Sequence, residues 1–203
     1  MKRHHIFAVI VLVIAAVIGA TAVILWQTSE QPRLAGSVNV SRGVQIGGPF
    51  TMTDHTGQPV TEKMLEGRYS LIYFGYTFCP DVCPTELQDM SVALDLAGEA
   101  GEKVLPVFVT IDPARDGQQQ MADYVAAFHP RMVGLRGTEE QTAAIAKAYR
   151  VYYAPVNQDD DYYLMDHSNF IFFMDPDGKN IAIFNGDTSP QTIADGIREA
   201  VGD

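Results

Sequence analysis

The sequence predicts an α/β fold in which a mixed sheet is sandwiched by helices. Residues 70–76 and 104–111 are continuous apolar runs of the kind that form strands buried on both faces, which is typical of a parallel sheet covered by helices. Near the C-terminus, Asp175-Pro-Asp-Gly178 separates two further apolar runs with a turn sequence and predicts a hairpin. Strands that alternate with helices and end in an antiparallel hairpin indicate a mixed sheet.

The first half of the folded region supplies a hairpin and two strand–helix units. Residues 50–61 carry a Gly-bearing turn between short extended segments and predict a small hairpin, and residues 62–67 follow as one helical turn. Pro84 suits the first position of the helix after the first apolar run, which makes Cys83 the expected cap of that helix. The helix N-terminus would then favour the thiolate of Cys83. After the second apolar run, Asp116 is expected to open another helix.

The second half of the folded region continues the alternation. Thr138 and Gln141 have the spacing of a capping box and predict the start of a helix. Ser189-Pro190 similarly marks the start of the last helix. The strands expected in this half cover residues 132–136, 169–174 and 181–184.

The N-terminal segment has the composition of a membrane anchor. Residues 6–26 contain no charge and are long enough to cross the hydrocarbon core as one helix. The basic residues before them favour the cytoplasmic side and place the rest of the chain across the membrane. A cleaved signal peptide is the alternative, because Ala20-Thr21-Ala22 offers a small-residue site, but the apolar run continues past that site. The expected organisation is a cytoplasmic tail (1–5), a single transmembrane helix (6–26), a linker (27–48) with a short strand near 38–44, and a folded domain (49–203).

The charge balance argues against nucleic acid as a partner. The chain has 203 residues, of which 47% are hydrophobic, and a net charge of -11. This length and apolar content suffice for one ordinary domain with a substantial core. Nucleic acids are held by basic patches, and so acidic a surface repels them.

The two cysteines of the chain, Cys79 and Cys83, lie where the first apolar run leads into its helix. In an open α/β sheet, ligands collect at the carboxyl ends of strands, which is where this junction lies. Two thiolates at this spacing can bind one soft metal ion or form a disulfide with each other. Because a bridge that closes so short a loop stabilises little, we expect the pair to have a chemical rather than a structural role.

Three motifs together resemble the Sco/SenC family, whose fold is thioredoxin-like. They are residues 74–84 (Phe-Gly-Tyr-Thr-Phe-Cys-Pro-Asp-Val-Cys-Pro), residues 109–116 (Val-Thr-Ile-Asp-Pro-Ala-Arg-Asp), and Asp166-His167-Ser168 ahead of a strand that ends in Asp175-Pro-Asp-Gly178. The resemblance runs from about residue 50 to the C-terminus and includes the N-terminal anchor. It implies a membrane-anchored copper metallochaperone, not an enzyme in the turnover sense, that helps assemble the copper A centre of cytochrome c oxidase.

For the site, the resemblance implies copper bound by Cys79, Cys83 and His167. Two thiolates and an imidazole suit Cu(I) and tolerate Cu(II), whereas a structural zinc site normally has a fourth protein ligand. In thioredoxin-like folds the loop before the C-terminal hairpin abuts the cysteine motif, and His167 is expected in that loop, where thioredoxins carry a cis-proline. The other histidines are less suitably placed: His4 and His5 in the tail, His55 in the predicted hairpin turn, and His129 at a helix end.

The resemblance also implies partners and a location. The copper-bearing subunit of cytochrome c oxidase is the expected recipient of the metal, and other periplasmic copper chaperones are further candidate partners. The expected location is the bacterial inner (cell) membrane, crossed once, with the N-terminus in the cytoplasm and the folded domain periplasmic or extracytoplasmic.

A thiol-disulfide oxidoreductase that reduces the cysteines of a partner protein is the competing function, with Cys79 and Cys83 as its redox pair. Oxidoreductases usually have two residues between their cysteines, and the three found here favour copper without excluding redox chemistry. A peroxidase-like function has only the N-terminal hairpin in its support. Among other polar groups, Asp159-Asp160-Asp161 is expected to be a solvated turn, while Asp112 and Arg115 either orient ligands or form an ion pair.

Overall fold

The computed structural model describes most of the chain beyond the N-terminal segment. The described residues are 12–14, 17–21, 34, 36–37, 44–156 and 163–202. Two compact units can be distinguished, Met1–Arg33 and Leu34–Asp203. Among the described residues, no helix has both the length and the apolar character needed to span a membrane. The expected spanning segment, 6–26, and the expected strand near 38–44 lie largely outside the described residues.

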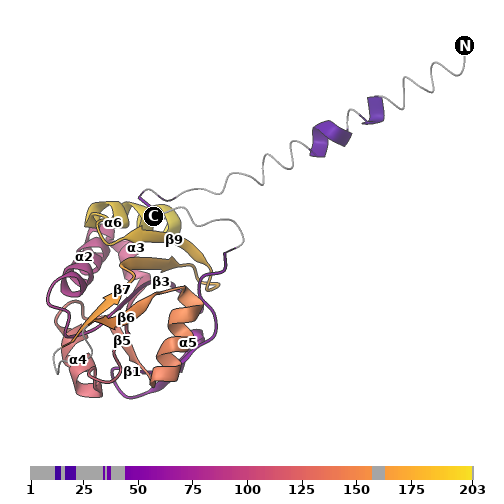
Figure 1. Ribbon diagram of the computed structural model, residues 1–203. Coiled ribbons are helices and arrows are strands. Elements are labelled where there is room, and N and C mark those ends of the chain that lie inside the picture. Colours follow the sequence, from indigo (N-terminus) through magenta and orange to yellow (C-terminus); the bar gives the residue numbers. More distant parts are fainter. Residues whose placement is uncertain are drawn as a thin grey trace, which may run out of the picture. The chain divides into compact units, whose positions relative to one another are not determined.

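A seven-stranded mixed sheet organises the second unit (Figure 1). The strand order is β2-β1-β5-β4-β3-β8-β9. Strand β4 pairs in parallel with β3 and β5, and the other neighbours are antiparallel. The predicted mixed sheet is therefore confirmed. The strands are β1 (Thr51–Asp54), β2 (Pro59–Thr61), β3 (Tyr69–Gly75), β4 (Val104–Thr110), β5 (Val133–Arg136), β8 (Phe170–Met174) and β9 (Asn180–Asn185).

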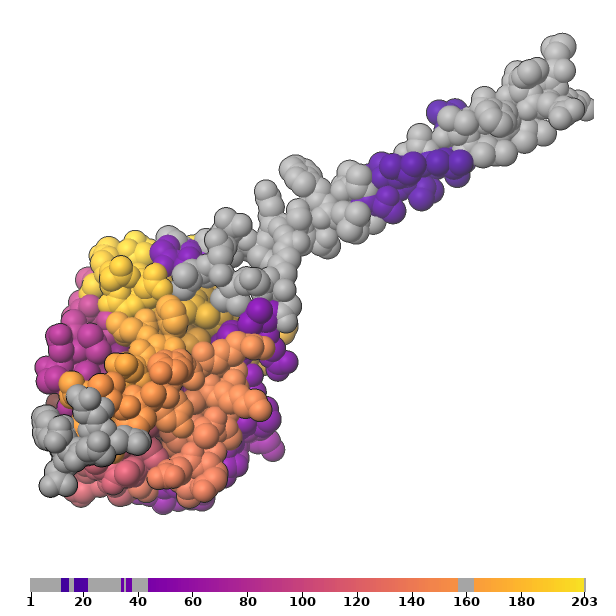
Figure 2. Space-filling model, viewed as in Figure 1, coloured from indigo at the N-terminus to yellow at the C-terminus, as the bar shows by residue number. Residues whose placement is uncertain are grey.

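Helices cover both faces of this sheet. Phe108 of β4 packs on Tyr124 of α4, with ring centroids 5.3 Å apart, and α2 and α6 pack together on the same side. Phe74 of β3 packs on Tyr149 of α5 at the same centroid distance, on the opposite side (Figure 1). In the space-filling view, α6 (yellow) lies directly against α2 (magenta) (Figure 2). The helices are α2 (Val82–Ala97), α3 (Glu99–Glu102), α4 (Gln118–Ala126), α5 (Glu139–Tyr149) and α6 (Pro190–Val201), with one 3-10 turn, η1 (Glu62–Leu65).

Strand β3 is the centre of the core. Its residues from Ser70 to Gly75 are all buried, because helices lie on both of its faces. Burial of an aromatic or aliphatic side chain contributes about 1.5–3 kcal/mol, so a strand of this composition is stable only inside the sheet. Leu34 and Ile46 also pack into the core, which shows that residues before Pro49 take part in the packing.

Two predicted helix starts are wrong, that of α2 by two residues and that of α4 by one. Helix α2 begins at Val82 with Asp81 as its N-cap, so Cys83 is not the cap but lies in the first turn. Helix α4 begins at Gln118 after Gly117, because the Asp116 side chain is engaged elsewhere in the fold. The other predicted helix starts are confirmed: Thr138 and Gln141 form a full capping box, and the Ser189 side chain accepts from the N–H of Thr192.

A second, two-stranded sheet was not predicted. Strand β6 (Tyr153–Val156) pairs antiparallel with β7 (Leu164–His167), and Tyr153 lies opposite His167. These segments contain Pro155 and polar residues and lack an apolar run, so their pattern suggested a loop. The expectation of a loop at 166–168 is therefore wrong in part, because His167 is the last residue of a strand.

Candidate metal centre

Three predicted site residues lie together at the carboxyl end of β3. The ligand atoms of Cys79, Cys83 and His167 all lie within 4.8 Å of one another. The cysteines come from the β3–α2 junction and the first turn of α2, and His167 comes from the end of β7. The shortest approach joins Cys83 Sγ and His167 Nε2, which are 3.4 Å apart. Residues distant in the sequence thus form one compact group of soft donors.

The imidazole of His167 is oriented by the backbone of its neighbour. Its Nδ1 lies 3.0 Å from the carbonyl oxygen of Ser168. A carbonyl oxygen only accepts hydrogen bonds, so Nδ1 carries the proton and donates it there. The lone pair of Nε2 then points toward Cys83, and this is the arrangement by which backbone carbonyls fix metal-binding histidines.

The start of α2 distinguishes the two thiols. The backbone N–H of Cys83 donates to Cys79 Sγ at 3.5 Å, so the sulfur of Cys79 receives a donor from the first helical turn. The Cys83 side chain lowers the pKa of the Cys79 thiol, with further lowering by His167 and against the effect of burial. The hydrogen bond that the Cys83 thiol donates to the Cys79 sulfur, together with burial, raises the pKa of Cys83. The expectation that the helix favours a thiolate at Cys83 is therefore wrong, and the more acidic thiol is Cys79.

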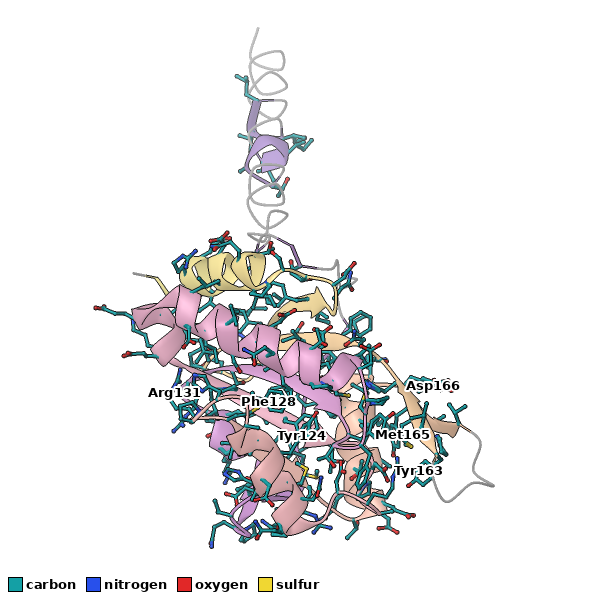
Figure 3. All side chains as sticks on the ribbon, turned by 90° about the vertical axis from the view of Figure 1, so that its left-hand side faces the viewer. Tyr124, Phe128, Arg131, Tyr163, Met165 and Asp166 are labelled. Carbon is teal, nitrogen blue, oxygen red and sulfur yellow. The ribbon has the colours of Figure 1, made fainter. Side chains whose placement is uncertain are left out.

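Aromatic rings form the walls around His167. The rings of Tyr73 and Tyr76 both contact the imidazole edge-on, with centroids 6.1 Å away. The hydroxyl of Tyr76 accepts the N–H of Met165, which ties β7 to the end of β3. Figure 3 shows Met165 and Asp166 beside the end of α2, with Tyr163 next to them. These contacts hold the histidine strand against the cysteine motif.

The mouth of the site is partly open and apolar. Cys83 is fully buried, whereas Cys79 has 9% of its surface exposed. Phe78 and Val82, which flank the cysteines, are about two-fifths exposed, at 39% and 41%. Of the two sulfur-bearing residues, Cys79 is therefore the less covered one.

Asp112 and Arg115 form the ion pair that was one of their two expected roles. Arg115 Nε donates to Asp112 Oδ2 at 2.5 Å, and Tyr163 donates its hydroxyl proton to the other carboxylate oxygen at 2.8 Å. The guanidinium also stacks on the Tyr163 ring, 3.6 Å from its centroid. This cluster fixes the start of β7 relative to the end of β4.

The buried carboxylate of Asp116 holds the loop that leads to Cys79. It accepts hydrogen bonds from the backbone N–H and the hydroxyl of Thr77, the latter at 2.6 Å, and from the hydroxyl of Thr110. Burial raises the pKa of Asp116, and the donated hydrogen bonds lower it in part. Its position in the 109–116 motif is thus explained by support of the site rather than by helix capping.

The remaining histidines are used elsewhere. His55 Nδ1 accepts from the N–H of Gly134 at 3.2 Å, and His129 Nδ1 accepts from the N–H of Arg131 at 3.1 Å. Their ring nitrogens therefore satisfy backbone donors, one in β5 and one just before it, and neither histidine belongs to the cluster of Cys79, Cys83 and His167. His4, His5 and the expected turn at 159–161 lie outside the described residues.

Two polar residues beside the site were missed by sequence reasoning. Glu86, on α2, is only 3% exposed, and its carboxylate accepts from Asn169 Nδ2 at 3.2 Å. The signal that could have found Glu86 is its place among the apolar positions of α2, three residues after Cys83. Burial raises the pKa of Glu86 to about 7, partly offset by the hydrogen bond from Asn169.

The buried carboxyl of Glu86 is expected to make the stability of the fold depend on pH. In the folded protein the Glu86 carboxyl keeps its proton up to a pH of about 7. In the unfolded protein it loses the proton near its ordinary pKa of 4.5. The folded state therefore binds more protons in that window, and stability falls as the pH rises through it. We expect Glu86→Gln to remove part of this decline, on the order of 1–3 kcal/mol between pH 4.5 and 8. Denaturant unfolding of both proteins across that range measures it, and parallel pH profiles would contradict the expectation.

The donor set fits a soft metal. Two thiols and one imidazole with a free Nε2 match the preference of copper, and among the described residues these three form the cluster that could hold an ion. The same sulfurs are close enough for a disulfide to form with modest movement, although both are free thiols here. Metal binding and dithiol oxidation therefore compete for one pair of atoms.

Comparison with protein families places these features in a known group. A family model described as SCO1/SenC matches residues 39–202, which include all three cluster residues. The chain is 46% identical to Protein sco1 of Schizosaccharomyces pombe over 157 residues, which are 75% of this chain and 60% of that protein. It is 40% identical to the SCO2-like protein of Rickettsia felis over 204 residues, 98% of this chain and 99% of that one.

A solved structure has the same fold. The structure of Bradyrhizobium japonicum ScoI with copper bound superposes with a TM-score of 0.70 at 42% sequence identity. The comparison covers 76% of this chain and 98% of that chain. The thioredoxin-like architecture expected from the motifs is therefore confirmed for the folded region.

Proposed function

The chain belongs to the SCO1/SenC family, and from that premise we propose that it is a copper metallochaperone whose ligands are Cys79, Cys83 and His167. The observation that carries the proposal is the convergence of these three donors within 4.8 Å. The copper bound in the Bradyrhizobium japonicum ScoI structure supports it. With three protein ligands, a fourth position on the metal remains for an incoming group, and this suits an ion that is handed on.

We further propose that the recipient is the copper-bearing subunit of cytochrome c oxidase, where the metal builds the copper A centre. Support comes from the motif resemblance and from the partly open mouth at Cys79, where a recipient's ligand could approach. Transfer proceeds by ligand exchange: each sulfur or nitrogen that the recipient supplies replaces one of the chain's ligands. Cys79, the more exposed sulfur, is the first ligand to be replaced.

A thiol-disulfide oxidoreductase remains the second candidate function. It is favoured by the difference between the thiols, since Cys79 keeps 9% of its surface exposed and has a lowered pKa, whereas Cys83 is fully covered and has a raised pKa. An accessible thiolate beside a buried thiol is the usual arrangement of a nucleophilic and a resolving cysteine. In this reaction the dithiol becomes a disulfide while a partner's disulfide takes up the two electrons and becomes a dithiol.

Copper titration of the reduced and the oxidised protein tests the copper function. We expect the anaerobically reduced chain to bind one copper ion, and the chain with a Cys79–Cys83 disulfide to bind at least about 100-fold more weakly, because oxidation removes both thiolates. Mass spectrometry verifies each redox form. Equal copper affinity in the two forms would rule out ligation by the dithiol.

We also propose that residues 6–26 anchor the protein in the bacterial inner membrane, with the folded region in the periplasm. The uncharged composition of this segment and the basic residues before it support the proposal. We expect the full-length protein to stay with the membrane pellet after alkaline carbonate extraction. Recovery of the intact chain in the soluble fraction would contradict the anchor.

A further inference from the structure

The carboxyl group of Glu86 is buried, and among the described residues Asn169 donates a hydrogen bond to it. It lies one helical turn after Cys83 on α2, and Asn169 donates to it from Nδ2. Burying an ionised carboxylate is costly unless the group is hydrogen-bonded. The pocket is shaped for the pair, because a Cβ on Gly186 would lie 2.5 Å from Glu86 Oε1 and collide with Asn169. This arrangement calls for a role beyond packing.

The Asn169 amide connects Glu86 to Tyr73. An ionised carboxylate only accepts hydrogen bonds, so Nδ2 of Asn169 faces Glu86. The amide oxygen Oδ1 then faces Tyr73. The Tyr73 hydroxyl lies 2.9 Å from that Oδ1 and 3.9 Å from Cys83 Sγ. A phenol has a single proton, so the hydroxyl donates to only one of these two acceptors at a time.

The donor and acceptor roles in this hydrogen-bond series depend on whether Glu86 carries a proton. With Glu86 ionised, Asn169 presents its oxygen to Tyr73 and accepts the hydrogen bond from the hydroxyl, so Cys83 Sγ receives no donor from Tyr73. Where Cys79 does not act as its acceptor, the Cys83 thiol can then donate to the phenol oxygen. With Glu86 neutral, its O–H can donate to Asn169 Oδ1, and the reversed amide then donates to the phenol oxygen. The Tyr73 proton is thereby released to donate to Cys83 Sγ.

We propose that Glu86 is a positioning residue for Cys83, acting through Asn169 and Tyr73 to determine whether the Cys83 sulfur receives a hydroxyl donor. Because burial holds the pKa of Glu86 near 7, both hydrogen-bond arrangements, with Glu86 ionised and with Glu86 neutral, are populated around neutral pH. The charged and titratable groups that act on Glu86 are Asp89 of its own helix, Asp187 after β9, and His167 of β7.

This inference deepens the proposed copper site and rests on it for its consequence. A hydrogen bond to a metal-bound thiolate stabilises the electron-rich form and so favours Cu(I) over Cu(II). Neutral Glu86 would then help retain the reduced metal, while ionised Glu86 would favour the oxidised one. The hydrogen-bond chain itself can be tested without metal.

The test uses the infrared S–H band of Cys83 in the metal-free, full-length Cys79→Ser protein, where Cys83 is the only cysteine. We expect the band to lie at lower frequency at pH 8.5, where Cys83 donates to Tyr73. At pH 5.5 it should move to higher frequency, with a midpoint near 7. Glu86→Gln and Tyr73→Phe should each abolish this pH-dependent shift, and combining them should add nothing further.

Matched controls are Tyr149→Phe, another buried tyrosine, and Asp95→Asn on the exposed face of α2, and both should keep the shift. A band that does not move with pH, or that still moves in Glu86→Gln, would overturn the inference. Absence of copper binding would instead count against the proposed function and leave the infrared result standing, so the two failures are distinguishable.

Discussion

Replacing Cys83 with serine is expected to remove tight copper binding, raising the dissociation constant for Cu(I) by at least about 1000-fold. Cu(I) is a soft ion, and a serine hydroxyl is a hard donor that stays protonated at neutral pH. Cys79→Ser should cause a loss of similar size, because either change leaves one thiolate and one imidazole. Competition with a Cu(I) chelator of known affinity measures both effects.

Stability must be followed beside affinity, because Cys83 is fully buried in the core. Ser91→Ala is a suitable control, since Ser91 is another small buried residue of α2 and its hydroxyl bonds only within the helix. We expect this control to bind copper normally. Tight copper binding by both folded serine variants would contradict a dithiolate site.

Replacing His167 with alanine should affect the two copper states differently. Two thiolates can hold Cu(I) alone, but Cu(II) prefers more ligands and a nitrogen donor. We expect Cu(II) affinity to fall by at least about 100-fold and Cu(I) affinity by less than about tenfold. Separate titrations with each copper state measure the difference.

The same variant separates the two candidate functions. Disulfide formation between Cys79 and Cys83 needs only two sulfurs within reach, so His167→Ala should retain it. The copper function then expects loss of oxidase assembly in cells, whereas a purely reducing function expects assembly to survive. His55→Ala is the matched control, because His55 binds a backbone N–H away from the cysteines. Full Cu(II) affinity together with normal oxidase levels would contradict the proposed role of His167.

Local patterns predicted the elements whose formation is decided locally. The apolar run at 70–76 became a strand that is buried from Ser70 to Gly75, because its composition can be accommodated only between two helical layers. The capping box at Thr138 and Gln141 formed as expected, since both of its hydrogen bonds lie within one turn. Such elements are recognised without knowledge of the rest of the fold.

Elements decided by distant contacts were not predicted correctly. Asp116 has the sequence pattern of a helix cap, but Thr77 and Thr110 draw its carboxylate into the core, and the helix starts one residue later than expected. The β6–β7 pair has no apolar pattern, and Tyr76 and Arg115 help hold β7 in place. Neither partner can be identified from the neighbouring sequence.

The candidate site divides in the same way. The cysteines and His167 were identified from motifs, and the structure brings them together. The assignment of the more acidic thiol to Cys83 failed because it depended on where α2 begins. The connection from Glu86 through Asn169 to Tyr73 joins α2, the loop between β7 and β8, and β3, so only the folded chain reveals it.

X-ray absorption spectroscopy at the copper edge of the loaded protein tests the three-ligand site most directly. Because the edge and the scattering shells report both oxidation state and ligand identity, the Cu(I) and Cu(II) forms can be compared on one sample. We expect two sulfur scatterers in both forms, and one imidazole nitrogen in the Cu(II) form that disappears in His167→Ala. A Cu(II) shell of nitrogen and oxygen without sulfur, or an imidazole signal that survives in His167→Ala, would contradict a centre built from Cys79, Cys83 and His167.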